Sequence, residues 1–85
     1  MTIKELKEEI ALLPDDMEVI VQKDGEGNGY SPLSGVYSDA VYIPETTWYG
    51  EVFDMSWTAD DADMEEDEWE DIKNKPRALI LHPVN

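Results

Sequence analysis

Two short apolar runs set the strongest limit on the fold of this chain. The run VIV spans residues 19–21, and the run ALIL spans residues 78–81. Runs of successive apolar residues are typical of strands covered on both faces of a sheet, and these two are expected to be neighbouring central strands. Only the N-terminal segment has the stripe of a strongly amphipathic helix. One helix covers one face, so another segment or a partner subunit must cover the other.

The amphipathic segment begins with the pattern of a capping box. Thr2 precedes Glu5 by three residues, so each side chain is expected to accept a hydrogen bond from the backbone amide of the other residue. The apolar residues that follow recur at spacings of three and four, as in a helix that lies on a core: Ile3, Leu6, Ile10 and Leu13. Pro14 is expected to end this helix.

Four later segments have the composition of strands, at about 17–23, 35–43, 47–57 and 77–83. Gly50 marks a turn or bulge in the third, and Pro32 indicates that the Gly-rich stretch before residue 35 contains no central strand. The sequence therefore predicts one α+β domain over residues 1–85, with the N-terminal helix packed on an antiparallel sheet of three to five strands and an acidic segment near the C-terminus. Its core would pair Leu79 and Leu81, or Ile80, with Val19 and Val21, or Ile20.

The charge narrows the classes of partner. The chain of 85 residues has 21 acids and six bases, a net charge of −15. Such a surface repels nucleic acid and anionic membranes, so basic proteins are the expected partners. There is no cysteine for a disulfide or thiolate site. No apolar run reaches the ~18 residues of a membrane span, and the N-terminus lacks the pattern of a signal peptide, so we expect a cytoplasmic protein.

The acids concentrate in the segment DDADMEEDEWED, which has nine carboxylates in twelve positions, residues 60–71. Disordered acidic tails are poor in aromatic residues, whereas this segment contains Trp69. Ala62, Trp69 and Ile72 are spaced by seven and three, which favours a short helix leaning on the sheet over a flexible brush. Its candidate partner-binding residues are Asp60, Asp61, Asp63, Glu65, Glu66, Asp67, Glu68, Trp69, Glu70 and Asp71.

Aromatic side chains are the second candidate for binding. The chain has eight, and seven of them are considered together because the domain is too small to bury them all: Tyr30, Tyr42, Trp48, Tyr49, Phe53, Trp57 and Trp69. Trp and Tyr are favoured anchors of protein interfaces, so Trp48 and Tyr49 join the partner-binding candidates. The alternative is that these rings only cap the open face of the sheet.

The loop DGEGNG resembles the start of an EF-hand calcium loop. Asp24, Glu26, Asn28 and Gly29 match its opening positions, but the twelfth position is Gly35 and not the Glu that supplies two oxygens. An ordered connection is therefore favoured, and no metal site is predicted. A recognition role for Asp24, Glu26, Asn28 and Tyr30 stays open.

Catalysis has little support in the sequence. His82 is the only histidine, and no nucleophile signature or cofactor motif accompanies it. Serines that would complete a triad can be drawn for any chain of this length. We therefore predict a protein that is not an enzyme and needs no cofactor.

Several segments together resemble a family of small proteins encoded by bacteriophages and prophages. They are IKELKEEIALLPDDMEVIV, DGEGNGYSPL, YIPETTWYGEV and the closing ALILHPVN. The family has no established activity, so the resemblance implies no functional residues. It does imply a setting, the cytoplasm of a phage-infected bacterium.

In that setting the charge suggests an acidic binding protein that occupies a basic, nucleic-acid-binding surface of a host defence or DNA-handling enzyme, as DNA mimics do. Carboxylates on an ordered scaffold can imitate the phosphates of B-DNA, which carries one charge per ~1.7 Å of axis. This part of the expectation is an analogy of size and charge. Two alternatives remain: an assembly accessory that self-associates, as a homodimer for example, through its aromatic face, and a weak calcium- or ligand-binding module at the Gly-rich loop.

Overall fold

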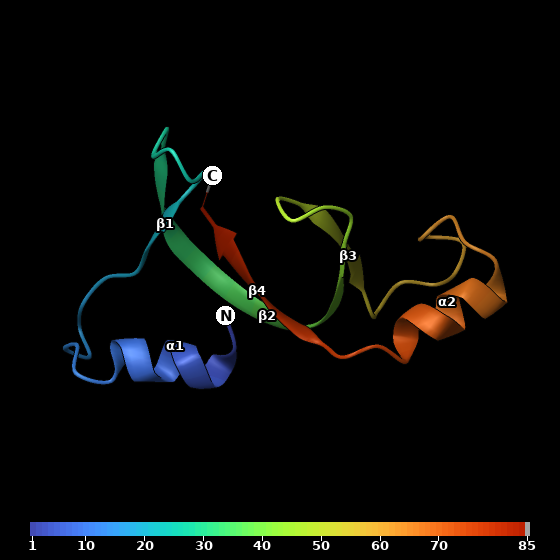
Figure 1. Cartoon of the computed structure of the whole chain (residues 1–85), viewed down its shortest axis with the longest axis horizontal. Helices are drawn as coiled ribbons and strands as arrows, with labels where there is room; N and C mark the ends of the chain where they lie inside the picture. The colour runs from blue at the N-terminus through green and yellow to red at the C-terminus, as the bar shows by residue number, and fades with distance from the viewer. Residues whose placement is uncertain (85) are drawn as a thin grey trace.

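The computed structural model describes residues 1–84, so only Asn85 of the closing ALILHPVN segment lies outside it. Two helices and a four-stranded antiparallel sheet confirm the α+β class (Figure 1). The elements in chain order are α1 (Ile3–Ile10), β1 (Ile20–Gln22), β2 (Tyr30–Pro44), β3 (Gly50–Asp54), α2 (Glu66–Lys73) and β4 (Ala78–Pro83).

The long strand β2 is the centre of the sheet. Pro32 pairs with Ile20 of β1, and the Pro32 carbonyl accepts a hydrogen bond from the Val84 amide at 3.0 Å. Further along β2, Ala40 pairs with both Asp54 of β3 and Ala78 of β4. A strand residue has one neighbour on each side, so β1 and β3 share one edge of β2 and β4 occupies the other.

This topology corrects two predictions about the apolar runs. The runs VIV and ALIL are not neighbours, because β2 lies between β1 and β4. Neither strand is covered on both faces: Val21 is the only half-buried residue of β1, and Leu81 in β4 is 45% exposed. A run of apolar residues indicates how much surface a strand must bury, but it does not indicate which strand pairs with it.

The prediction of a loop around Pro32 is also wrong, since β2 runs through it. Pro32 lacks an N–H, but the ladder continues on both sides of it. The Leu33 amide donates to the Val19 carbonyl at 3.1 Å, and Val84 bonds the Pro32 carbonyl. β2 therefore tolerates Pro32, because the hydrogen bonds at this point are made by the Leu33 amide and the Pro32 carbonyl, and neither needs an N–H on the proline.

Helix α1 starts as predicted but lies loosely against the sheet. The Glu5 amide donates to Thr2 Oγ1 at 3.2 Å, and the Thr2 amide donates to Glu5 Oε1 at 3.4 Å, which completes the capping box. The helix ends at Ile10. No residue of α1 is buried, and Ile3 is 49% and Ile10 50% exposed, so the close packing expected of this face is not made within the chain.

The core sits at the opposite end, where α2 meets β3. Phe53, Ala59 and Trp69 are buried together. Val41 of β2, which pairs with Phe53 of β3, is also buried. The prediction of a short helix that leans on the sheet agrees with this arrangement for Trp69 and Ile72. α2 begins only at Glu66, however, so Ala62 lies in the turns before the helix. α1 and α2 lie at the two ends of the long axis (Figure 1).

The third strand is shorter than predicted, and Gly50 begins it. A Cβ on Gly50 would overlap the Ile43 carbonyl oxygen and lie 2.8 Å from Tyr42 Cζ. The close approach of the two chains of the β2–β3 hairpin therefore requires glycine at this position. The hairpin tip consists of residues 45–49.

The molecule is extended for its length. It measures 45 × 27 × 24 Å with a radius of gyration of 15.5 Å, whereas a compact domain of this length has a radius of about 12 Å. No helix within residues 1–84 is both long and apolar enough to cross a membrane.

Candidate protein-binding site

The acidic segment is folded and is tied to the sheet by Trp69. We call residues 58–73 the acidic arm. Trp69 is 3% exposed, and its ring meets Phe53 of β3 edge-on, with centroids 6.2 Å apart and planes at 70°. Ala59, at the start of the arm, is also 3% exposed and completes the buried cluster. The side chains packed around it are Ile43, Met55, Ala62, Met64 and Ile72.

The first half of the arm is a series of hydrogen-bonded turns. The Thr58 amide donates to Asp61 Oδ2 at 2.9 Å, and the Asp61 amide donates to Thr58 Oγ1 at 3.2 Å. The Met64 amide then donates to the Ala59 carbonyl at 3.0 Å. Asp63 between them has a φ of 56°, a left-handed conformation that Asp tolerates better than most residues. These contacts fix the backbone of Asp60, Asp61 and Asp63.

The second half of the arm is α2, whose charges are arranged along the helix dipole. Glu66, Asp67 and Glu68 occupy its first turn, where negative charge is favourable, and Lys73 occupies its last turn. Lys73 Nζ lies 3.4 Å from Glu70 Oε1. Part of the repulsion among the carboxylates is therefore offset by their place in the helix.

Arg77 fastens the end of the arm to the sheet. Its Nη1 donates to the carbonyls of Lys73 and Lys75, both at 2.9 Å, and its Nε lies 3.4 Å from Asp39 Oδ1 on β2. The Arg77 guanidinium therefore bonds to groups of the chain itself. Its positive charge, next to the arm, is turned toward the protein and not toward a partner.

All nine carboxylates of residues 60–71 are exposed, and the structure brings them together on this one arm. Trp69 differs from the other predicted partner-binding residues: it is buried, so it holds the arm and does not contact a partner directly. A shallow hollow on the arm is lined by Asp60, Asp63, Met64, Glu65 and Glu68. Carboxylates around a half-buried Met64 suit the charged head and apolar stem of a Lys or Arg side chain.

Trp48 and Tyr49 lie elsewhere. They form the tip of the β2–β3 hairpin, where they are 89% and 58% exposed. Thr46 Oγ1 accepts hydrogen bonds from both of their amides, at 3.0 and 3.2 Å, so the tip is an ordered turn. This turn lies apart from α2 (Figure 1). The structure therefore separates the aromatic candidates from the acidic ones.

The Gly-rich loop is closed by its own polar groups. Asp24 Oδ1 accepts the amides of Asn28 at 3.1 Å and Glu26 at 2.9 Å, and the Asn28 bond foremost holds the pKa of Asp24 below its usual value. Gly27 has a φ of 79°, which the turn requires. The loop connects β1 to β2 as a hairpin, and Tyr30 is the first residue of β2. Within residues 1–84, no three His, Cys, Asp or Glu side chains are grouped to hold a metal ion.

One polar contact was not anticipated from the sequence. The Tyr37 hydroxyl on β2 donates to Asp54 Oδ1 on β3 at 2.7 Å, and the same oxygen accepts the Ser56 amide at 2.8 Å and its hydroxyl at 2.7 Å. The hydrogen bond to Asp54 raises the pKa of Tyr37 to about 12, and it lowers the pKa of Asp54. No sequence signal reveals it, because 17 residues separate the partners.

His82 lies exposed on β4, where its carbonyl accepts the Ser34 hydroxyl at 3.1 Å. That bond uses the backbone of His82 and joins β4 to β2. Ser34 is thus engaged in holding the sheet together.

Comparison of the chain with protein-family models, curated proteins and solved structures finds no match.

Proposed function

We propose that this chain is a non-enzymatic binding protein whose acidic arm occupies a basic surface of another protein. The observation that carries the proposal is the anchored arm: nine exposed carboxylates on a backbone held by the buried Trp69. A fixed array spares the ordering cost that a flexible acidic tail meets on binding. The other twelve acids of the chain are spread over residues 5–54.

The partner we propose has a surface made for nucleic acid. Five of the eight residues of α2 are acidic. With a rise of ~1.5 Å per residue, they place roughly one negative charge per 2.4 Å of axis, against one per ~1.7 Å in B-DNA. The two densities are close enough for one set of Lys and Arg side chains to contact either. The resemblance of the chain to small phage-encoded proteins leads us to expect a host DNA-handling or defence protein in an infected bacterium.

Affinity capture tests this proposal directly. The immobilised chain is exposed to nuclease-treated bacterial lysate at low salt, and bound proteins are identified by mass spectrometry. We expect basic nucleic-acid-binding proteins that duplex DNA displaces and that rising salt releases, since charges are screened over about 8 Å at physiological ionic strength. Recovery of no such protein at low salt would overturn the proposal.

A matched pair of variants separates the arm from the net charge. One variant carries Glu66→Gln, Asp67→Asn and Glu68→Gln on the arm. The other carries Glu26→Gln, Glu45→Gln and Glu51→Gln, which are exposed and lie outside both the arm and helix α1. Both lose three negative charges. Capture should fall for the first variant and persist for the second; an equal loss in both would mean that only the net charge matters.

The alternative of a self-associating accessory is favoured by a different observation, the exposed apolar surface at the other end of the molecule. That surface is formed by α1 and β4, and it does not include the exposed Trp48 and Tyr49.

A further inference from the structure

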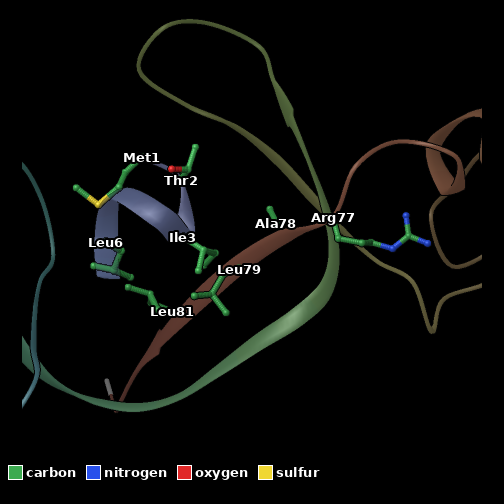
Figure 2. Close-up of a pocket in the computed structure, with 8 residues that line it drawn as sticks. All are labelled: Met1, Thr2, Ile3, Leu6, Arg77, Ala78, Leu79 and Leu81. Carbon is green, nitrogen blue, oxygen red and sulfur yellow. The ribbon is translucent and has the colours of Figure 1, made fainter. Parts of the chain in front are cut away.

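The end of the molecule opposite the arm contains an open apolar groove between α1 and β4. Ile3 lies toward Leu79, and Leu6 lies toward Leu81, across a cavity of about 540 Å³ (Figure 2). Protein interiors leave few voids larger than a water molecule, so this gap is not a packing defect of a closed core. Arg77, at the rim, points away from the groove (Figure 2).

The apolar surface continues past the end of α1. A second hollow is lined by residues of α1 and of the segment that leads to β1, and its apolar members are Ile10, Leu13, Pro14, Met17 and Val19. Leu12 beside it is 99% exposed, Met17 52% and Val19 57%. Solvent-exposed leucines occur singly on many proteins, but apolar side chains gathered in two hollows along one helix indicate an interaction site.

The excess surface has the size of a dimer interface. A folded monomer of 9.7 kDa exposes roughly 5,100 Å², whereas this chain exposes 6958 Å², an excess of about 1,850 Å². The excess is spread over the whole extended molecule. If half of it lay at the groove, two chains would bury about 1,850 Å² in a dimer, within the range of about 1,200–2,000 Å² found for stable interfaces.

The charge distribution also favours a second copy as the occupant. Residues 30–38 and 78–84, which form most of the sheet at this end, contain no acid, Lys or Arg. Helix α1 carries both signs in each half, with Lys4 and Glu5 in the first and Lys7, Glu8 and Glu9 in the second. Antiparallel pairing of two α1 helices would therefore bring Lys and Glu side chains of both copies together, which suits the self-complementary contact of a two-fold interface. The acidic arms, at the far end of the 45 Å axis, would point away from each other.

We infer that the chain forms a two-fold homodimer through the groove between α1 and β4, with the groove of each copy covered by α1 and the following segment of the other. This inference does not rest on the function proposed for the arm. The dimer and the binding of a basic partner by the arm should respond to salt in opposite directions. Salt should weaken capture of a basic partner, but it should strengthen a dimer of two chains that each carry −15, because it screens their repulsion.

Sedimentation equilibrium of the full chain, over a range of concentrations and salt, is the first test. We expect the mass of two chains, about twice 9.7 kDa. The variant Ile3→Glu should reduce this to the mass of one chain, and an acid at the first turn of α1 is compatible with the helix. Val52→Glu on β3 makes the same change of charge on an exposed apolar residue outside the groove, and it should leave the dimer intact.

A wild-type chain that stays monomeric at the highest concentration would overturn the inference. Loss of the dimer in Val52→Glu or in Trp48→Ala, with Ile3→Glu still dimeric, would also overturn it, in favour of the aromatic face.

A second measurement does not depend on destabilising the groove. The chain has no cysteine, so Lys7→Cys on α1 and Asp71→Cys on the arm each accept one spin label. Distances between the two labels of a dimer should be short for position 7 and long for position 71. The reverse order would place the arms at the contact and contradict the proposed interface.

Discussion

The rings of Trp69 and Phe53 meet edge-on, with centroids 6.2 Å apart and planes at 70°. This contact joins the most charged segment of the chain to strand β3 of the sheet. Aromatic pairs of this geometry contribute about 0.5–1.5 kcal/mol beyond the surface that they bury. The repulsion among nine carboxylates is therefore opposed by one well-packed apolar cluster, on which the order of the arm depends.

Trp69→Ala should weaken capture of basic proteins although it leaves the net charge unchanged. The substitution removes a buried ring, for which a loss of about 3–5 kcal/mol in the free energy of unfolding is expected. Urea denaturation and affinity capture measure the two effects. The control is Trp48→Ala, which removes an 89% exposed ring and should change stability by less than ~0.5 kcal/mol. Equal capture by wild type and Trp69→Ala would show that order in the arm is irrelevant to binding.

Neutralising single charges on α2 should have unequal effects on stability at its two ends. Asp67 lies in the first turn, where the helix dipole favours a negative charge, and its Oδ1 accepts the Glu68 amide at 3.0 Å. Asp71 lies in the last turn, where the dipole opposes it. Asp71→Asn should therefore raise the melting temperature more than Asp67→Asn does. Identical shifts in the two variants would mean that overall repulsion alone sets the stability of the arm.

Gly50→Ala should destabilise the β2–β3 hairpin, because the new methyl group would meet the backbone at Ile43. We expect a loss of about 1–3 kcal/mol, typical of overpacking. Gly35→Ala in β2 is the matched control, since a Cβ there has no neighbour within 4 Å. Chemical denaturation of both variants is the measurement, and equal stability of the two would contradict the close approach at residue 50.

The Tyr37–Asp54 hydrogen bond should contribute fully to the stability of the fold only within a certain range of pH. The pKa of Tyr37 is raised to about 12, so the contribution of its phenol is complete below pH 10 and is lost as pH rises toward 12. The pKa of Asp54 is lowered from 3.8, so its contribution is complete above that value and is lost as pH falls through the folded-state pKa. In an absorbance titration, one of the four tyrosines should ionise near pH 12, and Tyr37→Phe should remove that step. Absence of a step near pH 12 in the wild type would contradict the contact.

Local patterns in the sequence predict the local parts of this structure. The Thr2–Glu5 capping box, the four strand segments and the helix around Trp69 each depend on residues close in sequence, and the structure contains all of them. The arm was predictable because Trp69 and Ile72 supply the only large apolar side chains with helical spacing in an acidic run.

The parts that the sequence does not reveal are those set by pairing between distant segments. Nothing local indicates that β2 extends from Tyr30 through Pro32, because the hydrogen bonds that permit it come from β1 and from Val84. The same holds for the Tyr37–Asp54 contact. The open face of α1 differs from the prediction for another reason: the apolar stripe indicates that the helix has a surface to bury, but not where the surface that covers it lies.

Amide hydrogen exchange of the free chain across residues 59–73 tests the central claim most directly. The account predicts that these amides, above all those of Met64, Trp69 and Asn74, whose backbone hydrogen bonds close the turns and α2, are protected in the wild type without a partner. In Trp69→Ala their protection should fall while that of β2 and β4 persists. Exchange of residues 59–73 at the rate of an unstructured chain in the wild type would contradict the account, because the carboxylates would then be a flexible brush.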